Sequence, residues 1–331
     1  MKALLSKAPG GPDSLVVEEV AAPVVGPGQL KLRVRAAAVN YPDVLIIEDK
    51  YQFKPPRPFS PGGEVAGEVV EVGEGVTGWA VGDRAIAVPG WGGMAEEIVI
   101  AAASAYRLPA GRSFVDGAAL LLTYATSIHA LWDRGRLEAG ETLLVLGAAG
   151  GVGLAAVELG KARGARVVAA VSSEDKAAAA RAAGADETLV YPRGDLDREA
   201  SKALAEAFKA AVGKGGADVV YDPVGGDYAE PALRAIGWEG RYLVVGFPAG
   251  IPRLPLNLTL LKSCDVCGVF WGAFAAREPA ANAAHVAELF ALWDAGKIAP
   301  KVSATYPLAR GGEAIAALAG RSVIGKLVVE L

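Results

Sequence analysis

A glycine-rich segment near the middle of the chain, residues 147–153, constrains the fold more than any other feature. It follows the apolar run Thr142–Leu146 and leads into the helical pattern Val152–Arg163, and a second apolar run, Arg166–Val171, comes next. A strand, a glycine-rich turn, a helix and a second strand in this order predict a βαβ unit whose two strands lie parallel.

This turn has the residues that a dinucleotide-binding turn requires. Glycine lets the backbone approach a pyrophosphate closely, and the N-terminus of the following helix offers free N–H groups to the phosphates. In the Gly-x-Gly-x-x-Gly spacing, Ala148 stands at the first position, and Gly150 and Gly153 stand at the other two. The alternative is that these glycines serve only the close packing of the helix on the strand.

The patterns on either side of this unit differ. After Gly140, short apolar runs alternate with helical stretches, which predicts an α/β fold with a doubly wound parallel sheet covered on both faces. Before residue 115, strand-like runs are separated by Pro/Gly clusters, which predicts a small, mostly antiparallel β domain. The chain length of 331 residues fits about two domains. Near the end we expect a strand over 266–274, a helix over 280–294 and a last strand over 325–331.

The end of the second strand of the βαβ unit indicates which dinucleotide binds. A carboxylate there would accept hydrogen bonds from the ribose 2′-OH of NAD, but this strand ends in Val171-Ser172-Ser173, with Lys176 just beyond. Hydroxyls and an ammonium favour a 2′-phosphate, which points to NADPH. The alternative is that Ser172 caps a helix and that Lys176 is a solvated helix residue, and the nearby Glu174 and Asp175 favour that alternative.

Composition and charge exclude several classes of protein. The chain has 33 basic and 37 acidic residues, so its net charge of −4 argues against nucleic acid or an anionic membrane as the main partner. Two cysteines and two histidines exclude a disulfide-rich fold and a multi-thiolate metal site. The first residues lack the apolar core of a secretory signal, and no apolar stretch is long enough to span a bilayer, so we expect a cytoplasmic protein.

The run from Gly140 to Lys161 resembles the signature of a known family. Gly140-Glu141, Leu144, the segment Ala148-Ala149-Gly150-Gly151-x-Gly153 and Lys161 are similar to the quinone oxidoreductase (zeta-crystallin) signature of the medium-chain dehydrogenase/reductase superfamily. One departure is Glu158, where a Gln is usual. The resemblance covers the whole chain, since Asn40-Tyr41-Pro42-Asp43 is similar to the family's Asn-x-x-Asp segment.

The resemblance also implies that no zinc is bound. The segment Pro61-Gly62-Gly63-Glu64 occupies the place of the Gly-His-Glu motif of zinc alcohol dehydrogenases, and Gly63 stands where those enzymes have a zinc-binding His. Asn40 lies in the region where they have a zinc-binding Cys, and the four-cysteine structural lobe is missing. The fold implied is a Rossmann domain inserted into a GroES-like β domain built from both chain ends, with boundaries 1–123, 124–271 and 272–331.

The resemblance implies a set of cofactor-binding residues. Lys176 and Tyr191 have the spacing of the family's clamp for the 2′-phosphate of NADPH, and Phe247 would lie near the nicotinamide at the carboxyl edge of the sheet. The full implied set is Thr126, Gly150, Gly151, Val152, Ser172, Lys176, Tyr191 and Phe247.

Hydride transfer without zinc needs a small-molecule acceptor that is already electrophilic, because no Lewis acid polarises an alcohol or ketone. A quinone needs no protein acid, whereas an enone or enoyl-CoA needs a proton donor, and Tyr51 matches the position of the catalytic Tyr in related enoyl reductases. Tyr51 as a packing or loop residue is the alternative. Asn40 either binds the substrate carbonyl or the nicotinamide ribose, or else serves a turn before Tyr41-Pro42.

Two further expectations concern partners. The resemblance implies a homodimer that pairs through strand 265–274, although the aromatic residues at its end also fit a core strand or a pocket lining. A protein that binds NADPH without turnover, as a crystallin-like or RNA-binding relative would, is the alternative to an enzyme. The negative net charge argues against the RNA-binding version.

Overall fold

A computed structural model describes residues 1–331, and the chain divides into two compact units. The first contains residues 1–122 and 300–331, and the second contains residues 123–299. The first boundary lies within one residue of the predicted 123/124. The second differs from the predicted 271/272, because the chain returns to the first unit only at residue 300.

The first unit is the GroES-like β domain. A hairpin pairs β1 with β2, and a seven-stranded sheet has the order β14-β15-β3-β4-β5-β7, with β6 paired to β3. Its elements are β1 (Lys2–Leu5), β2 (Val16–Glu19), β3 (Gln29–Val39), α1 (Tyr41–Ile47), β4 (Glu64–Val72), β5 (Arg84–Ala87), β6 (Glu97–Ala101), β7 (Ala105–Arg107), α2 (Phe114–Ala118), β14 (Val302–Pro307), α11 (Gly311–Ala319) and β15 (Lys326–Glu330).

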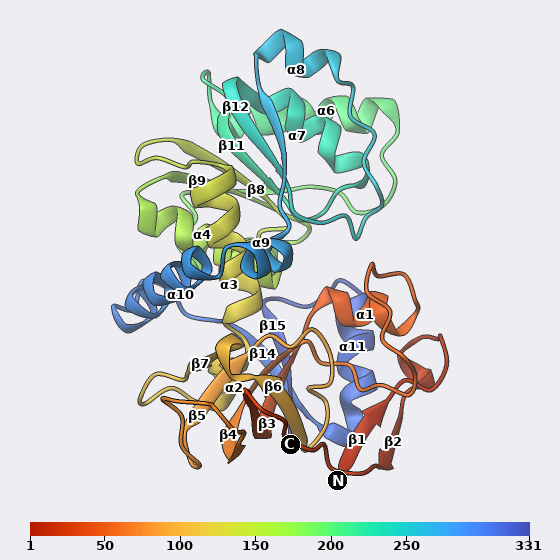
Figure 1. The fold of residues 1–331 in the computed structure, drawn as a ribbon. Coiled ribbons are helices and arrows are strands. Elements are labelled where there is room, and N and C mark those ends of the chain that lie inside the picture. The colour runs from red at the N-terminus through yellow and green to blue at the C-terminus, as the bar shows by residue number, and fades with distance from the viewer. The chain divides into compact units, whose positions relative to one another are not determined.

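Both ends of the chain build this unit, and the N and C labels of Figure 1 both lie within it. The last strand, β15, runs antiparallel to β3, with Leu327 opposite Val39 and Glu330 opposite Ala36. The side chains of Leu30, Leu32 and Val329 are buried in one core. The last strand therefore completes a sheet that the first half of the chain begins, as predicted.

The second unit is the Rossmann domain. Its six-stranded parallel sheet has the order β10-β9-β8-β11-β12-β13. From β8 the chain adds strands first on one side and then, from β11, on the other, so the strand order reverses between β8 and β11, which pair in parallel. Figure 1 shows α4 and α6 packed around this sheet. Its elements are α3 (Leu121–Ile128, with the first two residues in the other unit), a π-helical turn (His129–Arg134), β8 (Thr142–Leu146), α4 (Gly151–Arg163), β9 (Arg166–Val171), α5 (Glu174–Ala182), β10 (Glu187–Val190), α6 (Arg198–Val212), β11 (Ala217–Asp222), α7 (Ala229–Ala235), β12 (Ile236–Val244), α8 (Asn257–Lys262), β13 (Asp265–Gly268), α9 (Trp271–Arg277) and α10 (Pro279–Asp294).

The strands of this sheet form where the sequence is continuously apolar. Leu143–Leu146 in β8 and Val167–Val171 in β9 are all buried. A strand that helices cover on both faces buries every side chain, which explains the absence of alternation. This order of strands places the ligand crevice of a doubly wound sheet beside the carboxyl end of β8.

The predicted strand 266–274 is wrong from residue 269 onward. The strand β13 ends at Gly268, and Phe270 precedes the helix α9. Periodicity alone does not separate a short apolar strand from a helical turn, and here the helix is favoured by tertiary contacts. Trp271 Nε1 donates to Asn282 Oδ1 of α10 at 2.8 Å, and the Phe274 ring stacks on His129 with centroids 4.1 Å apart.

These contacts also explain why residues 272–299 belong to the Rossmann unit. The helix α10 is attached by Trp132, whose Nε1 donates to Glu288 at 3.0 Å, and by the ring of His285, 5.6 Å from that of Phe274. Val286, Leu289 and Trp293 are buried. The sequence contains the helix but does not indicate which unit it covers.

Candidate functional site

The glycine-rich turn joins β8 to α4 with the geometry of a phosphate-binding turn. Gly147 has φ 56°, in the left-handed region, and Gly150 stands before the first residue of α4. No side chain caps this end of the helix. Gly150 N donates to Gly147 O at 3.0 Å, whereas Gly151 and Val152 lie in the first turn of α4, where N–H groups have no partner within the helix. Both residues are half-buried, so an anionic group can reach these N–H groups.

Gly153 and Gly150 are glycines for different reasons. A Cβ at Gly153 would lie 2.3 Å from Gly147 O, so the close packing of α4 on the turn excludes any side chain. A Cβ at Gly150 would lie no closer than 3.5 Å to any protein atom, which is ordinary contact. Packing therefore explains Gly153 and leaves Gly150 unexplained. The absence of a side chain at Gly150 fits the close approach of a pyrophosphate.

Ser172 and Lys176 lie together after the end of β9. Lys176 Nζ lies 3.4 Å from Ser172 Oγ, and both side chains are half-buried. Burial lowers the pKa of Lys176, and the positive charge of Arg193 lowers it further. The structure thus adds Arg193 to this group, and a basic residue two positions after Tyr191 is the signal that sequence reasoning missed.

Tyr191 is buried beside the glycine-rich turn. Its hydroxyl accepts a hydrogen bond from the backbone N–H of Gly147, and its ring lies 4.9 Å from that of Tyr228. Its backbone N–H donates to Val171 O at 2.8 Å. Tyr191 therefore connects the end of β9 to the turn.

Thr126 lies half-buried on α3, next to a residue that sequence reasoning missed. The buried Ser127 hydroxyl lies 3.1 Å from Val152 O and 2.8 Å from the Tyr221 hydroxyl. These bonds connect α3 to the first turn of α4 and to β11. An isolated Ser in an apolar helix gives no signal of this in the sequence.

Phe247 lies beyond the carboxyl end of β12, which stops at Val244, and its side chain is exposed. Asp222, at the end of β11, organises the neighbouring loop. Its carboxylate accepts hydrogen bonds from Val224 N at 2.8 Å, from Gly225 N at 2.9 Å and from the Tyr242 hydroxyl at 2.6 Å. A Cβ at Gly225 would lie 2.6 Å from Phe247 Cβ, so this glycine allows the Phe247 segment to pack.

In the GroES-like unit, Asn40 belongs to a buried polar cluster. Its Nδ2 donates to Glu64 Oε2 at 3.1 Å, and its Oδ1 accepts a bond from Lys326 Nζ. Lys326 also forms an ion pair with Glu64 at 3.1 Å, and Glu64 Oε1 accepts a bond from Leu122 N at 2.8 Å. Both polar atoms of the Asn40 side chain are therefore occupied inside this unit, which favours its role in holding the local chain over a substrate contact.

Lys326 was missed because it lies 286 residues from Asn40 along the chain. The signal was a lysine at the start of the apolar strand Lys326-Leu327-Val328-Val329, where a buried charge needs a partner.

Asp43 supports the same region from the first turn of α1. Its carboxylate accepts bonds from Asn40 N and from Gly62 N, each at 2.8 Å. Burial raises the pKa of Asp43 to about 6, although these two bonds and the charge of Lys326 oppose the shift.

Tyr51 is half-buried and packs against the core of the GroES-like unit. Its ring meets that of Phe53 edge-on, with centroids 5.9 Å apart. Burial raises the pKa of the Tyr51 hydroxyl, and the negative charge of Asp43 raises it further. The hydroxyl is therefore protonated at neutral pH, as a proton donor must be.

Two of the three basic residues near Tyr51 are already neutralised. Lys50 pairs with Glu48 at 2.6 Å, and Arg57 pairs with Asp49 at 2.7 Å. Lys54 alone has no such pair. These side chains therefore provide little positive charge for the phosphates of a CoA ester.

The residues present do not fit a zinc ion. No group of three or more His, Cys, Asp or Glu side chains lies close enough together to hold a metal. At Gly63, a Cβ would lie 2.8 Å from Gly90 O, so the backbone leaves no room there for a histidine.

Two family profiles match the chain, one on each unit. The alcohol dehydrogenase GroES-like domain family matches residues 26–110, and the zinc-binding dehydrogenase family matches residues 151–287. Among curated proteins, the chain is 36% identical to mouse quinone oxidoreductase-like protein 2, over 96% of this chain and 89% of the mouse protein. The chain belongs to the quinone oxidoreductase family. It is therefore an oxidoreductase of the medium-chain dehydrogenase/reductase type.

One further relative and two solved structures agree with this assignment. The Nematostella vectensis homolog of quinone oxidoreductase-like protein 2 is 36% identical over 92% of this chain and 82% of its own. Escherichia coli quinone oxidoreductase, solved in complex with NADPH, is 29% identical with a TM-score of 0.90 over 100% of both chains. A mycobacterial protein, also solved with NADPH, is 28% identical with a TM-score of 0.92 over 100% of both chains.

No helix of this family member is both long and apolar enough to cross a lipid bilayer.

Proposed function

We propose that this protein reduces quinones with NADPH and without zinc. The observation that carries the proposal is the Ser172–Lys176 pair, which follows β9 where an NAD-specific Rossmann domain places a carboxylate. Arg193 adds a second positive charge near Lys176. The NADPH complexes of the two related structures support the same cofactor.

The cofactor would be held by residues at the carboxyl edge of the Rossmann sheet. Gly151 and Val152 would bind the pyrophosphate with the free N–H groups of α4, and Gly150 would let it approach the turn closely. Ser172 and Lys176 would bind the 2′-phosphate, with Tyr191 beside them. Thr126 and Phe247 would flank the nicotinamide half. When bound, the nicotinamide supplies a hydride.

The acceptor has to be electrophilic without help from a metal. The absence of a zinc-binding set of side chains and the lack of space at Gly63 support this. A quinone meets the requirement, because its reduced oxyanion takes protons from water. The chain's own part is to bind, orient and exclude water, and Asn40 acts as a positioning residue through Glu64 and Lys326.

Reduction of an enone is the second candidate, and Tyr51 is the observation that favours it. Its hydroxyl stays protonated because burial and Asp43 raise its pKa, so it can donate a proton to an enolate carbon. Among enones, a CoA ester is the less favoured acceptor, because Lys50 and Arg57 are neutralised by Glu48 and Asp49.

The test measures NADPH consumption with 9,10-phenanthrenequinone and with crotonyl-CoA, for the wild type and Tyr51→Phe. Tyr306→Phe removes a hydroxyl elsewhere in the GroES-like unit and is the matched control. A quinone reductase should keep its quinone rate in both variants and turn over crotonyl-CoA poorly.

Two other outcomes would contradict the proposal. Preferred turnover of crotonyl-CoA that collapses only in Tyr51→Phe would make the protein an enoyl reductase with Tyr51 as its acid. NADPH binding without turnover of either acceptor would favour a binding protein.

A further inference from the structure

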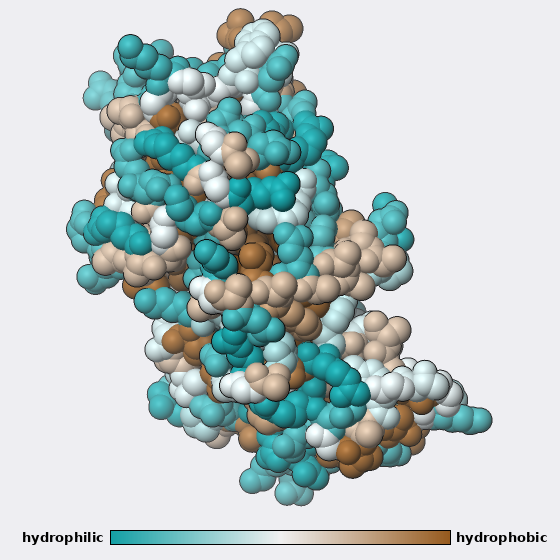
Figure 2. All heavy atoms as spheres, turned by 90° about the vertical axis from the view of Figure 1, so that its left-hand side faces the viewer, coloured by the Kyte–Doolittle hydropathy of each residue, from teal (hydrophilic) through white to brown (hydrophobic).

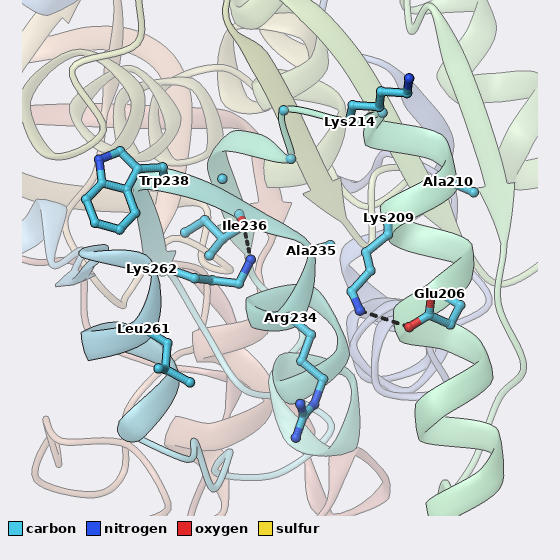
Figure 3. Close-up of a pocket in the computed structure, with 14 residues that line it drawn as sticks. Glu206, Lys209, Ala210, Lys214, Arg234, Ala235, Ile236, Trp238, Leu261 and Lys262 are labelled. Carbon is cyan, nitrogen blue, oxygen red and sulfur yellow. Dashed lines mark hydrogen bonds and ion pairs between the residues drawn. The ribbon is translucent and has the colours of Figure 1, made fainter.

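A pocket of about 750 Å³ lies in the Rossmann unit, outside the cofactor site (Figure 3). Its walls are the end of α6, the loop 213–216 that leads into β11, the end of α7, the start of β12 and the end of α8. The pocket therefore lies at the amino ends of β11 and β12. The glycine-rich turn follows the carboxyl end of β8, at the opposite edge of the parallel sheet.

Basic side chains outnumber acidic ones in this pocket. Lys209, Lys214, Arg234 and Lys262 line it, against one carboxylate, Glu206. Two of the four charges are compensated, because Lys209 pairs with Glu206 at 2.8 Å and Arg234 pairs with Glu230 at 2.6 Å. Lys214 and Lys262 have no carboxylate within ion-pair distance. The pocket therefore carries an excess of positive charge.

Lys262 and Lys209 extend into the pocket from opposite walls (Figure 3). Lys262 Nζ donates to the carbonyl oxygen of Ile236, which leaves its charge unneutralised. Burial lowers the pKa of Lys262, and the positive charge of Lys209 lowers it further. The two ammonium groups repel each other, and an anion bound between them would relieve that repulsion.

The loop 213–216, Gly213-Lys214-Gly215-Gly216, adds backbone donors. Gly213 and Gly216 have φ values of 87° and 79°, so the loop turns tightly. The N–H groups of Lys214 and Gly215 have no acceptor in the protein. A Cβ at Gly215 would meet no atom within 4 Å, so packing does not require glycine there. Free N–H groups in successive positions of a tight turn are a common anion-binding feature.

An aromatic residue, Trp238, also lines the pocket. Between Val219 and Ala217, β11 advances by two residues, while β12 advances from Ile236 to Arg241, so β12 bulges there. The bulge places Glu239 at φ 57° and leaves the Trp238 side chain 69% exposed. Bulges re-aim side chains, and an exposed indole on a strained bulge suits contact with a flat ring.

We propose that this pocket binds a phosphorylated small molecule that carries a flat ring, as a nucleoside monophosphate does. Lys209, Lys262 and the loop 213–216 bind the phosphate, and Trp238 stacks on the ring. The proposal does not depend on the reaction at the cofactor site. The apolar end of the unit at α8, which Figure 2 shows as brown spheres at the top, borders the pocket through Leu261.

The test is isothermal titration of the full chain with AMP, in saturating NADPH so that the dinucleotide site is occupied. Inorganic phosphate and adenosine are titrated separately, so that the contribution of the phosphate to binding is distinguished from that of the ring. The variants are Lys209→Ala with Lys262→Ala, Trp238→Ala, and Lys297→Ala as a control that removes one exposed charge far along the chain.

We expect saturable AMP binding that the double lysine variant weakens at least tenfold, as lost charge-assisted hydrogen bonds predict, while Lys297→Ala leaves it unchanged. Trp238→Ala should weaken the binding of AMP and leave the binding of inorganic phosphate unchanged. No saturable binding up to about 10 mM AMP, or binding that the double lysine variant does not change, would overturn the proposal. Competition between AMP and NADPH in every variant would overturn it too, because it would place AMP in the cofactor site.

Discussion

The Tyr124 hydroxyl donates a 2.6 Å hydrogen bond to Glu158 Oε2, and Ala299 N donates to the same oxygen at 2.9 Å. This pair joins α3, α4 and the end of the Rossmann unit at the position where the family signature has Gln. Burial raises the pKa of Glu158 and also raises the pKa of Tyr124. The departure from the signature is therefore a buried carboxylate whose charged form the fold disfavours.

Glu158→Gln should stabilise the protein at pH 8. A carboxyl group whose pKa is raised by folding lowers the free energy of unfolding as pH rises from its unfolded pKa through its folded pKa. An amide oxygen accepts both bonds without that cost. We expect the free energy of unfolding to increase by about 1 kcal/mol at pH 8, which corresponds to a rise in Tm of about 2–4 °C, and to change little at pH 4. Glu138→Gln, an exposed change, is the control, and an equal effect of both variants would contradict the explanation.

Asp43→Asn should remove part of the pH dependence of stability. Folding raises the pKa of Asp43 from 3.8 to about 6, so the contribution of Asp43 to the free energy of unfolding should rise as pH falls from 7 to 4. A shift of about two pH units corresponds to about 3 kcal/mol. The variant should be less stable at pH 7, because an amide cannot accept both backbone N–H bonds. Denaturant unfolding at several pH values tests this, and parallel profiles for the two proteins would disprove it.

Lys176→Ala should weaken the binding of NADPH far more than the binding of NADH. A charge-assisted contact to the 2′-phosphate contributes about 1.5–3 kcal/mol, so the Kd for NADPH should rise about 10- to 100-fold. Fluorescence titration with both cofactors measures the difference. Lys202→Ala, an exposed lysine on α6, is the matched control. Equal losses for both cofactors would refute the 2′-phosphate assignment.

Gly150→Ala should lose affinity for NADPH, whereas Gly153→Ala should lose stability. A methyl group at Gly153 meets backbone atoms at 2.3 Å and 2.8 Å, so this variant should lose about 2–3 kcal/mol of stability. A methyl group at Gly150 has room in the protein but lies where a pyrophosphate must approach. Gly150→Ala should therefore keep its Tm and bind NADPH at least tenfold more weakly. Thermal unfolding and cofactor titration of both variants separate these effects, and a normal NADPH affinity in Gly150→Ala would argue against the binding turn.

Val266→Lys should give a monomer if the edge strand β13 pairs with a second copy, as the family resemblance implies. Val266 is 40% exposed on one edge of the sheet, and Val190, 43% exposed, lies on β10 at the other edge. A lysine on a pairing edge disrupts pairing. Light scattering after gel filtration should show a dimer for the wild type and for Val190→Lys. A wild-type monomer, or a dimer that Val266→Lys leaves intact, would exclude this interface.

The sequence predicted the parts of the molecule in which local pattern and tertiary environment agree. The continuous apolar runs of β8 and β9 flank a glycine-rich turn and a helix, and in that order they predicted buried strands. Gly153 is glycine because α4 packs closely on the turn. The start of β12 at Ile236 is not evident from the sequence, because the bulge at Trp238 interrupts the apolar pattern.

Other features depend on contacts between distant residues. The strand predicted over 266–274 becomes a helix from Trp271, since Asn282 and His129 bind its aromatic side chains. Asn40 was open to a substrate role until the fold brought Lys326 to it.

By itself, the sequence determined the two kinds of sheet, the glycine-rich turn between β8 and α4 and the family, because glycine spacing and apolar runs act over a few neighbouring residues. Only the tertiary structure decided which unit α10 covers, that Asn40, Glu64 and Lys326 form one buried cluster, and that basic residues from four elements line one pocket. Burial and the pairing of charges depend on which residues meet in space, and that is set by the packing of the whole chain.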